Sequence, residues 1–493
     1  MPRRPSHNDD SPMSRPSIGS QPRSSQSSFL SEFDFAEGLP DLDEDDHGGH
    51  GRSGNGMQKP LLGNIAAPAV TMAGGEESGD EEDQIKMPQE GGGLVNSFFN
   101  MSNSIIGAGI IGLPFAFKEA GVVMGIVLLI VLAIMTDWTI RLIILNAKMS
   151  GKDNYQDIVS HCFGPKGFFF CCLAQISFAY GGIAAFCVII GDTIPHVLSA
   201  LIPGLKDIPV IGLLANREAA IVFCTVFISY PLSLYRDISK LAKASALALV
   251  SMVVIILTVI IQGPRVPDTD DWRGRKVEWA VFDMGFFKAI GVISFAFVCH
   301  HNSLLIYGSL KKPTLNRFTT VTHWSMGISL GACLIMALAG YLNFKDKTVG
   351  NILVNFPPEG EPGSNLMVTF ARFCFGFNCF TTLPLEAFVC REVVTSYYWR
   401  HTPFSLRRHV LLTSAFVFSG MCISLLTTDL GIVLQLAGST SAVALAYLFP
   451  TLCWLKEAEG PWWGWKKLPA VGCAAFGMIV MVVTSIEAIW SRL

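Results

Sequence analysis

The stretch FFNMSNSIIGAGIIGLPFAF, from Phe98 to Phe117, is apolar enough for a lipid bilayer but poorly suited to a continuous helix. Three glycines fall within six residues, a proline follows, and four polar residues come just before. These residues are Asn100, Ser102, Asn103, Ser104, Gly107, Gly109, Gly112 and Pro114. In hydrocarbon an unpaired backbone N–H or C=O costs several kcal/mol, so a membrane helix stays intact unless its break lines a cavity inside the protein. Glycine permits unwinding and the close approach of a ligand, so the stretch predicts a broken helix at a ligand site.

A second interrupted segment, ISFAFVCHHNSLLIYGSLKKP from Ile293 to Pro313, carries a polar cluster at His300–Ser303 between apolar flanks. Taken alone, the glycines of the first segment would indicate close helix packing. Two interrupted segments in corresponding places of two halves are instead typical of inverted-repeat transporters. Freed N–H groups at the start of one half-helix suit a carboxylate, and freed C=O groups at the end of the other suit a cation or an ammonium group. The pair therefore predicts a site for a small zwitterion.

The composition favours a membrane protein with a polar arm. Of 493 residues, 51% are hydrophobic and 15% are charged, with a mean hydropathy of +0.44, whereas soluble proteins average roughly 25% charged residues. Residues 1–93 hold 17 acidic and seven basic residues and are rich in Ser, Pro and Gly, so we expect a disordered acidic arm. Within it, GEESGDEED around Ser78 and KPLLG could engage a kinase or a sorting partner, although a plain solvated tail is the favoured interpretation.

Eleven segments approach the length of about 20 apolar residues that a membrane helix needs. They lie near 94–117, 121–146, 167–195, 218–234, 240–262, 285–308, 316–342, 365–390, 408–427, 430–454 and 469–489. The fourth is short and has polar ends. With the arm in the cytosol, the cytosolic loops carry 17 Lys and Arg residues against 11 on the other side, as the positive-inside rule requires. The C-terminus is then outside or in a lumen.

Charged residues inside the spans are few, and each is a candidate functional group. Asp137 lies four residues before Arg141, which indicates an i,i+4 ion pair. Asp192, near the outer end of the third span, either caps a helix break or faces a vestibule. For Glu386, pairing with Arg391 at the membrane interface is favoured over a proton-carrying role.

His300 and His301 are the titratable residues best suited to proton coupling, because histidine ionises at the pH boundary between a neutral cytosol and an acidic lumen. Either could equally be a satisfied hydrogen-bond partner. Thr381 and Thr382 stand just before Pro384, where the eighth span loses a backbone hydrogen bond. Their hydroxyls either satisfy the helix or offer oxygen ligands to a cation. The 13 cysteines lie mostly in apolar segments, and we expect buried, inert thiols.

The quoted motifs resemble the amino acid/auxin permease family, which includes sodium-coupled neutral amino acid transporters of animals and vacuolar amino acid transporters of fungi. NMSNSIIGAGIIGLPFAFKEAG is similar to the first-span signature of that family, and FAFVCHHNSLLIYGSL is similar to its sixth-span signature. DWTIRLIILNAKMSGKDNYQDIV and GDTIPHVL look closer to its fungal vacuolar branch. The resemblance covers roughly residues 94–490 and none of the arm.

The resemblance implies an all-α membrane protein with eleven transmembrane helices in a leucine-transporter-type 5+5 inverted repeat, in which helices 1 and 6 are broken. Repeat one then covers about 94–262, repeat two about 285–454, and an extra helix about 469–489. By the same resemblance, the carboxylate and amine of the substrate meet the unwound parts of spans one and six. These positions are Asn103, Ser104, Gly107, Ala108, Gly109, Ser294, Phe295 and Phe297. The cation site of the family maps to Ser102, Asn103, Thr381 and Thr382, without a choice between the threonines.

These features predict a secondary active transporter of neutral amino acids in an intracellular, vacuolar membrane, working by alternating access with protons as the coupling ion. The alternatives are sodium coupling and an amino acid receptor that signals through the arm. The chain has no HExxH motif, so we expect no enzyme, no cofactor and no metal. The expected partners are the amino acid and the lipid bilayer, not nucleic acid. The predicted outer loops have no glycosylation sequon and no cysteine, which does not favour the plasma membrane.

Overall fold

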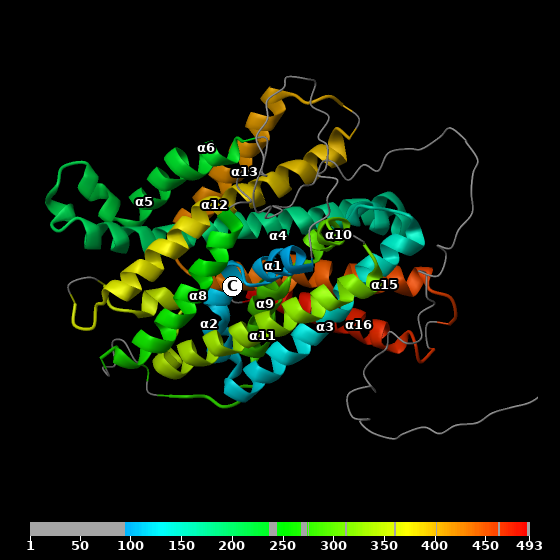
Figure 1. Cartoon of the computed structure of the whole chain (residues 1–493), viewed down its shortest axis with the longest axis horizontal. Coiled ribbons are helices and arrows are strands. Elements are labelled where there is room, and N and C mark those ends of the chain that lie inside the picture. The colour runs from blue at the N-terminus through cyan, green and yellow to red at the C-terminus, as the bar shows by residue number, and fades with distance from the viewer. Residues whose placement is uncertain are drawn as a thin grey trace, which may run out of the picture. The chain divides into compact units, whose positions relative to one another are not determined.

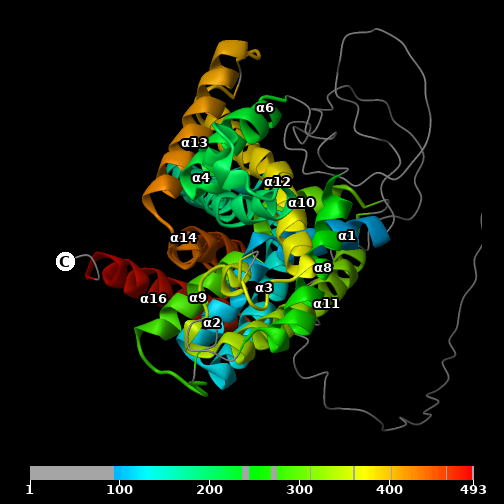
Figure 2. The same ribbon diagram turned by 90° about the vertical axis from the view of Figure 1, so that its left-hand side faces the viewer.

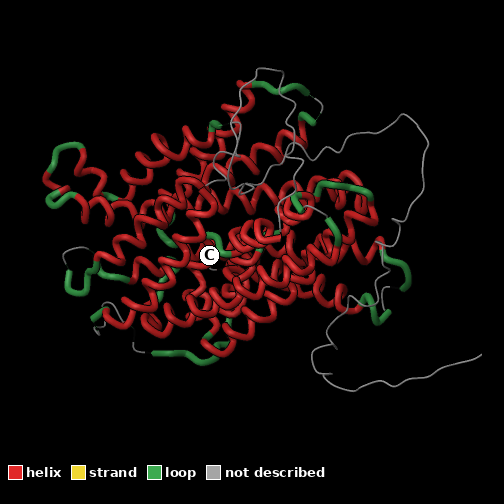
Figure 3. The backbone as a smooth tube through the Cα atoms, viewed as in Figure 1, coloured by secondary structure: helices red, strands yellow, loops and turns green. Residues whose placement is uncertain are grey.

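The computed structural model describes residues 94–235, 244–267, 274, 276–310, 313–358, 361–400, 402–461 and 464–490. All of them belong to one unit of the chain, Gly48–Leu493. Their long regular elements are all helices (Figure 3). The predicted acidic arm, 1–93, lies outside the described residues.

The first half of the described chain holds the helices of predicted spans one to five (Figure 1). They are α1 (Leu94–Ile105), η3 (Ala108–Gly112), α2 (Leu113–Ala120), α3 (Val122–Ser150), α4 (Tyr155–Leu201), α5 (Arg217–Cys224), the π-helical η6 (Thr225–Ser229), α6 (Tyr230–Ser233) and α8 (Ala244–Gln262). Short 3-10 turns, η4 (Leu205–Asp207), η5 (Ile211–Ala215) and η7 (Gly263–Arg265), lie between or after them.

The second half holds predicted spans six to eleven. Its helices are α9 (Met284–Phe297), α10 (His300–Gly308), α11 (Leu315–Phe344), α12 (Leu366–Tyr398), α13 (Leu406–Leu426), α14 (Leu430–Ala437), the π-helical η10 (Gly438–Ala442) and η11 (Ala444–Leu448), α15 (Phe449–Glu457) and α16 (Leu468–Trp490). Two short 3-10 turns, η8 (Lys345–Lys347) and η9 (Ile352–Asn355), lie between α11 and α12.

Ten helical segments of the described residues are long and apolar enough to cross a membrane, which confirms the all-helical membrane fold. The fourth predicted span differs from the rest. It is helical from Arg217 to Ser233 through α5, η6 and α6, which is shorter than the roughly 20 residues that a helix needs to span the hydrocarbon.

The third predicted span begins earlier than expected. α4 starts at Tyr155 rather than near 167, and Gly164 divides it with a non-helical φ of 65° and ψ of −157°. Pro165 follows, so the segment before Gly164 is a separate helical piece rather than the beginning of the apolar span. A search for continuous apolar segments does not find this helical piece, because polar residues interrupt its sequence.

Both predicted interruptions are present. Ile106 and Gly107 separate α1 from η3 in the first span. In the sixth span Val298 and Cys299 separate α9 from α10, with ψ angles of 108° and 14° that interrupt the helix.

Two groups of helices surround these breaks (Figures 1 and 2). α2, α3, α9 and α11 pack together as a first group, and α4, α12 and α13 pack together as a second group. Each group thus combines helices from both halves of the chain. The helices α2, α3 and α4 of the first half pack with α9, α11 and α12, their counterparts five spans later, as in an inverted repeat.

Glycines allow the closest approaches inside the first group and around it. A Cβ at Gly109 would lie 2.5 Å from Ala296 Cα, so η3 rests directly on the backbone of α9. A Cβ at Gly438 would collide with the carbonyl oxygen of Gly291. The small residues of span ten therefore serve close helix packing.

The connection between α11 and α12 is attached to both groups. Lys118 Nζ of the first group donates to the Thr348 carbonyl at 3.0 Å. The buried Arg372 of α12 donates to the carbonyls of Leu353 and Phe356 at 2.9 and 2.8 Å. The loop therefore bridges the two helix groups.

Candidate functional site

The two helix breaks lie side by side. Asn302 Nδ2, in the first turn of α10, donates to Ser104 Oγ near the end of α1 at 3.3 Å. Both residues are half-buried. Residues from two segments 198 positions apart in the chain therefore share one polar region.

The glycines of the first break have different surroundings. A Cβ at Gly107 would meet nothing closer than the Asn103 carbonyl oxygen at 4.0 Å, so the space beside this backbone is open to a ligand. Gly109 is buried against α9, where its missing side chain serves packing. Ala108, between them, begins η3. Among the predicted glycines, Gly107 is the one whose surroundings suit backbone recognition.

The predicted residues on α9 form the buried side of the region. Ser294 and Phe297 are fully buried, and Phe295 is 8% exposed. The ring of Phe295 lies 5.1 Å from that of Phe178 on α4. An apolar, aromatic wall thus stands beside the second break, which suits an uncharged side chain.

The two histidines follow the second break and differ in their contacts. His300 is fully buried, and its Nε2 lies 2.9 Å from Thr139 Oγ1 on α3. The His301 ring lies 5.4 Å from the Phe178 ring, at an interplanar angle of 50°. The Nδ1 atom of each histidine is buried and has no hydrogen-bond partner among the described residues. His300 is thus partly a structural hydrogen-bond partner, and each ring keeps a nitrogen available.

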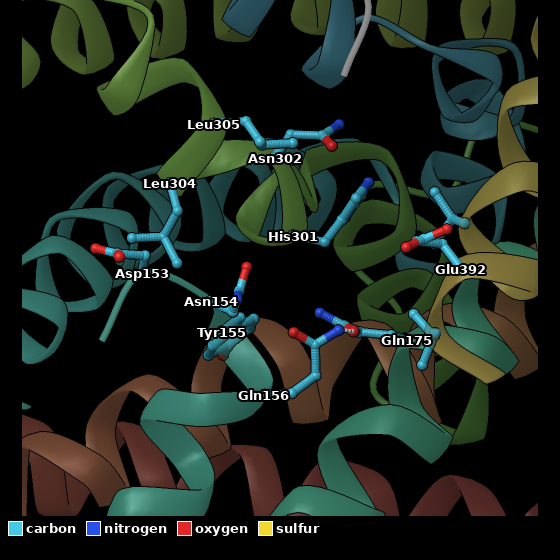
Figure 4. Close-up of a pocket in the computed structure, with 12 residues that line it drawn as sticks. Asp153, Asn154, Tyr155, Gln156, Gln175, His301, Asn302, Leu304, Leu305 and Glu392 are labelled. Carbon is cyan, nitrogen blue, oxygen red and sulfur yellow. Dashed lines mark hydrogen bonds between the residues drawn. The ribbon is translucent and has the colours of Figure 1, made fainter. Parts of the chain in front are cut away.

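A pocket lies beside His301, between the start of α4, α10 and α12 (Figure 4). Gln156 and Gln175 meet there, with Nε2 of the first 2.6 Å from Oε1 of the second. Asn302, which bonds Ser104, also lines the pocket, so the pocket adjoins the breaks. Its lining comprises Asp153, Asn154, Tyr155, Gln156, Gln175, His301, Asn302, Leu304, Leu305, Val389, Glu392 and Val393. Sequence reasoning missed the lining from α4 and α12, because only tertiary packing brings these residues together.

The hydroxyls of Thr381 and Thr382 bond within their own helix. They donate to the Asn378 carbonyl at 2.9 and 2.8 Å, the ordinary arrangement of threonine in a membrane helix. Ser102 is buried, and its Oγ has no hydrogen-bond partner among the described residues. Asn103 is half-buried. A cation site built from these four residues stays a prediction.

The expected ion pair of Asp137 is confirmed. Arg141 Nη2 lies 3.0 Å from Asp137 Oδ2. A second partner was not foreseen, since His323 Nδ1 on α11 lies 2.9 Å from Asp137 Oδ1. Asp137 therefore connects α3 to α11, and no local spacing in the sequence could indicate this contact.

Asp192 has bonded partners that its position in the sequence does not indicate, and its role at a helix break or a vestibule stays a prediction. Its Oδ1 accepts from Arg217 Nε at 3.1 Å, and its Oδ2 accepts from Asn351 Nδ2 at 3.1 Å. Arg217 also donates to the carbonyls of Ser424 and Thr427 at 3.2 and 3.3 Å. Asp192 is thus the centre of a bonded cluster that joins four distant segments.

The favoured pairing of Glu386 with Arg391 is wrong. Arg391 Nη1 instead donates to the Ser233 carbonyl at 3.1 Å and to Thr413 Oγ1 at 2.7 Å. Residues five apart on an α-helix point about 140° away from each other, so the two side chains leave α12 on different sides. Glu386 Oε2 is buried and has no hydrogen-bond partner among the described residues.

A further ionic cluster ties the last helix to the core. Lys288 Nζ on α9 lies 3.4 Å from Glu487 Oε1 on α16 and 3.9 Å from Glu119 Oε2 on α2. Gln435 Nε2 donates to Glu487 Oε2 at 3.1 Å. The sequence alone does not indicate this cluster, because its residues lie in different spans.

Two broken helices that meet inside an all-helical membrane protein define the class of leucine-transporter-type secondary transporters. The solved structure of MhsT in complex with L-phenylalanine has this fold and aligns with a TM-score of 0.52 and 15% identity, over 80% of this chain and 98% of that chain. The chain belongs to the transmembrane amino acid transporter protein family, whose model matches residues 90–490. The resemblance seen in the motifs is thereby confirmed.

Similar proteins are named as transporters rather than as enzymes. Vacuolar amino acid transporter 2 of Saccharomyces cerevisiae is 38% identical over 473 residues, which is 93% of each chain. Putative sodium-coupled neutral amino acid transporter 11 of Danio rerio is 38% identical over 394 residues, covering 79% of this chain and 85% of that one. The human protein of the same name is 34% identical over 377 residues, covering 76% and 89%.

Proposed function

We propose that this transporter carries neutral amino acids across a vacuolar membrane by alternating access, coupled to protons. The observation that supports this most directly is the contact of the two helix breaks through Ser104 and Asn302. The breaks leave backbone groups of both signs at one place, with an open space beside Gly107. Such a place matches the two charged ends of an amino acid.

The substrate would lie with its carboxylate at the N–H groups that begin η3 and its ammonium at the carbonyl groups that end α9. Asn103, Ser104, Gly107, Ala108 and Gly109 would contribute from the first break. Ser294, Phe295 and Phe297 would contribute from α9. The aromatic wall of Phe295 and Phe178 supports an uncharged substrate side chain, because a charged one would lose its hydration there without a partner.

The compartment and the orientation rest on separate observations. The 38% identity to a fungal protein named as vacuolar supports the vacuolar membrane. The surplus of Lys and Arg in the loops on the side of the arm supports a cytosolic N-terminus and a lumenal C-terminus. A cytosolic arm would be accessible to a kinase at Ser78 or to a sorting partner.

Sodium coupling is the second candidate, because animal relatives are named as sodium-coupled. Ser102, Asn103, Thr381 and Thr382 would then hold the ion, since hard cations prefer oxygen ligands. Proton coupling needs no such cage, and the buried Nδ1 atoms of His300 and His301 support it.

Uptake into proteoliposomes of the purified full-length protein tests the proposal. A panel of labelled amino acids is offered under an imposed pH gradient and, separately, under a sodium gradient. Accumulation of neutral amino acids driven by the pH gradient alone is expected. Accumulation that requires sodium would identify sodium rather than the proton as the coupling ion. Binding without net flux under either gradient would favour a receptor.

Deletion of residues 1–85 tests the arm. Unchanged transport with lost sorting or signalling would assign the arm a regulatory partner, and unchanged behaviour throughout would make it inert.

A further inference from the structure

The carboxyl group of Glu386 is an unusual feature of the second helix group. It lies in the middle of α12 (Leu366–Tyr398), and its Oε2 is buried with no hydrogen-bond partner among the described residues. A charged carboxylate without a partner inside a membrane protein is costly, so such a group takes up a proton or marks a functional site. The helix itself does not require a buried carboxyl group at Glu386, so a functional role is the explanation to consider.

The helix opposite is shaped to receive this carboxyl group. A Cβ at Gly182 on α4 would lie 3.1 Å from Glu386 Cγ, 3.2 Å from its Cδ and 3.6 Å from its Oε2. The glycine thus leaves the space that the carboxyl group fills. The Glu386 side chain is held against the backbone of α4 rather than free to reach the membrane surface.

Among the described residues, no basic side chain bonds the buried Oε2 of Glu386. Arg391, five residues along α12, is engaged with Ser233 and Thr413. The described part of α8 and the whole of η6 carry no titratable side chain.

The remaining elements against α12 hold titratable groups that have other contacts. Titratable side chains on α4, α6, α10 and α13 include Tyr180, Tyr230, His301, Arg408 and His409. Tyr180 packs on Phe416, and Tyr230 bonds Ser414. Arg408 bonds Thr402 and the Pro403 carbonyl, and His409 bonds the Leu234 carbonyl. Of these five groups, His301 is the one with a buried nitrogen that has no hydrogen-bond partner among the described residues.

Glu386 lies about one helical turn from residues at the pocket of Figure 4. Phe178, whose ring lies beside that of His301, precedes Gly182 by four residues on α4, which is about one turn or roughly 6 Å. On α12, Val389 lies one turn beyond Glu386 and lines the pocket. The pocket also includes Asp153 and Asn154 from the connection between α3 and α4, which the proposed orientation places at the cytosolic face.

We propose that Glu386 binds and releases the coupled proton, and that His301 and the adjoining pocket connect it to the cytosol. This inference rests on the proposed function and names the group that carries out its coupling step. The contact between His301 and Phe178 joins α10 to the second helix group, so a relative movement of the two groups opens or closes this route. A proton binds Glu386 from the lumenal side and is released through His301 to the cytosolic side.

Proteoliposomes of the full chain carrying Glu386→Gln test the inference with two measurements. The first is exchange of labelled amino acid at equal pH, which needs no net proton transfer. The second is accumulation under a pH gradient, with a pH-sensitive dye inside the vesicle. We expect Glu386→Gln to retain exchange while losing both accumulation and substrate-induced proton flux. The control, Glu361→Gln, changes an exposed loop carboxylate and should behave like the wild type.

Accumulation by Glu386→Gln equal to that of the wild type would overturn the inference while leaving proton coupling intact. Loss of exchange in a variant with unchanged thermal unfolding would also overturn it, because the carboxyl group would then serve substrate binding. If the wild type accumulates substrate only with sodium, proton coupling is wrong and the proposed role of Glu386 is wrong with it.

If Glu386→Gln does not fold, the variant Gly182→Ala tests the same carboxyl group, because the added methyl group on α4 would contact it. It should shift the pH dependence of accumulation, and an unchanged pH profile would count against Glu386.

Discussion

The two helix breaks reach a similar shape with different residues. The first contains Gly107 and Gly109, whereas the second, at Val298 and Cys299, has no glycine between Ile293 and Tyr307. Gly107 has a φ of −84°, and Val298 and Cys299 have φ of −73° and −124°, all of which any residue adopts. Glycine is therefore not needed to unwind either helix. It is needed where η3 meets α9 and where a ligand could approach.

The largest effect should come from Gly109→Ala, because the added methyl group would lie 2.5 Å from Ala296 Cα and cannot be accommodated by a side-chain movement. We expect a loss of stability of about 1–3 kcal/mol or more, as for other overpacked sites, together with lost transport. Thermal unfolding of the purified protein measures the first effect. Gly327→Ala on α11 is the matched control, because its Cβ would meet no atom within 4 Å. Equal melting temperatures for the two variants would mean that η3 does not pack on α9 in this way.

Gly107→Leu should separate folding from transport. Because a Cβ at Gly107 would meet no atom closer than 4.0 Å, we expect the variant to fold and to insert into the membrane. Its side chain should nevertheless occupy the place proposed for the substrate, so uptake is expected to be lost, with a smaller loss for Gly107→Ala. Uptake at the wild-type level by Gly107→Leu would exclude this space from the substrate site.

At the second break, stability should depend on the hydrogen bond of His300 rather than on a small residue. Thr139→Val removes the hydroxyl that lies 2.9 Å from His300 Nε2 and leaves a buried polar group unpaired, at a cost of about 1–3 kcal/mol. Chemical denaturation in detergent would measure this cost. Thr320→Val, which removes an exposed threonine hydroxyl on α11, should cost less, and an equal cost would argue against a special role for the His300 contact.

The smallest effect should come from the bond that joins the breaks. Ser104 and Asn302 are half-buried and 3.3 Å apart, so a double-mutant cycle with Ser104→Ala and Asn302→Ala should give a coupling of about 0.5–1.5 kcal/mol. Additive losses would indicate that the two breaks are independent of each other in the purified protein.

Local spacing explains which features could be predicted from the sequence. Both breaks were visible as polar or glycine-rich interruptions of apolar runs, and the Asp137–Arg141 pair follows from the helix period. Membrane helices are recognisable because the bilayer imposes their length and polarity.

Contacts between distant residues explain what could not be predicted. The partners of Asp192 lie 25 and 159 residues away. The five-residue spacing of Glu386 and Arg391 likewise does not indicate that Arg391 bonds Ser233 and Thr413. The different roles of Gly107 and Gly109 depend on what faces each of them in space. Their two-residue spacing gives no information on this difference.

The loop between α11 and α12 has mechanical consequences for a protein whose helix groups must move apart. Its Thr348 end follows directly from α11 and accepts a bond from Lys118, and its other end is held to α12 through several bonds from Arg372. The loop is therefore fixed to both groups. A relative movement of the groups must be absorbed by the few residues between Thr348 and Leu353, which lie between the two attachments.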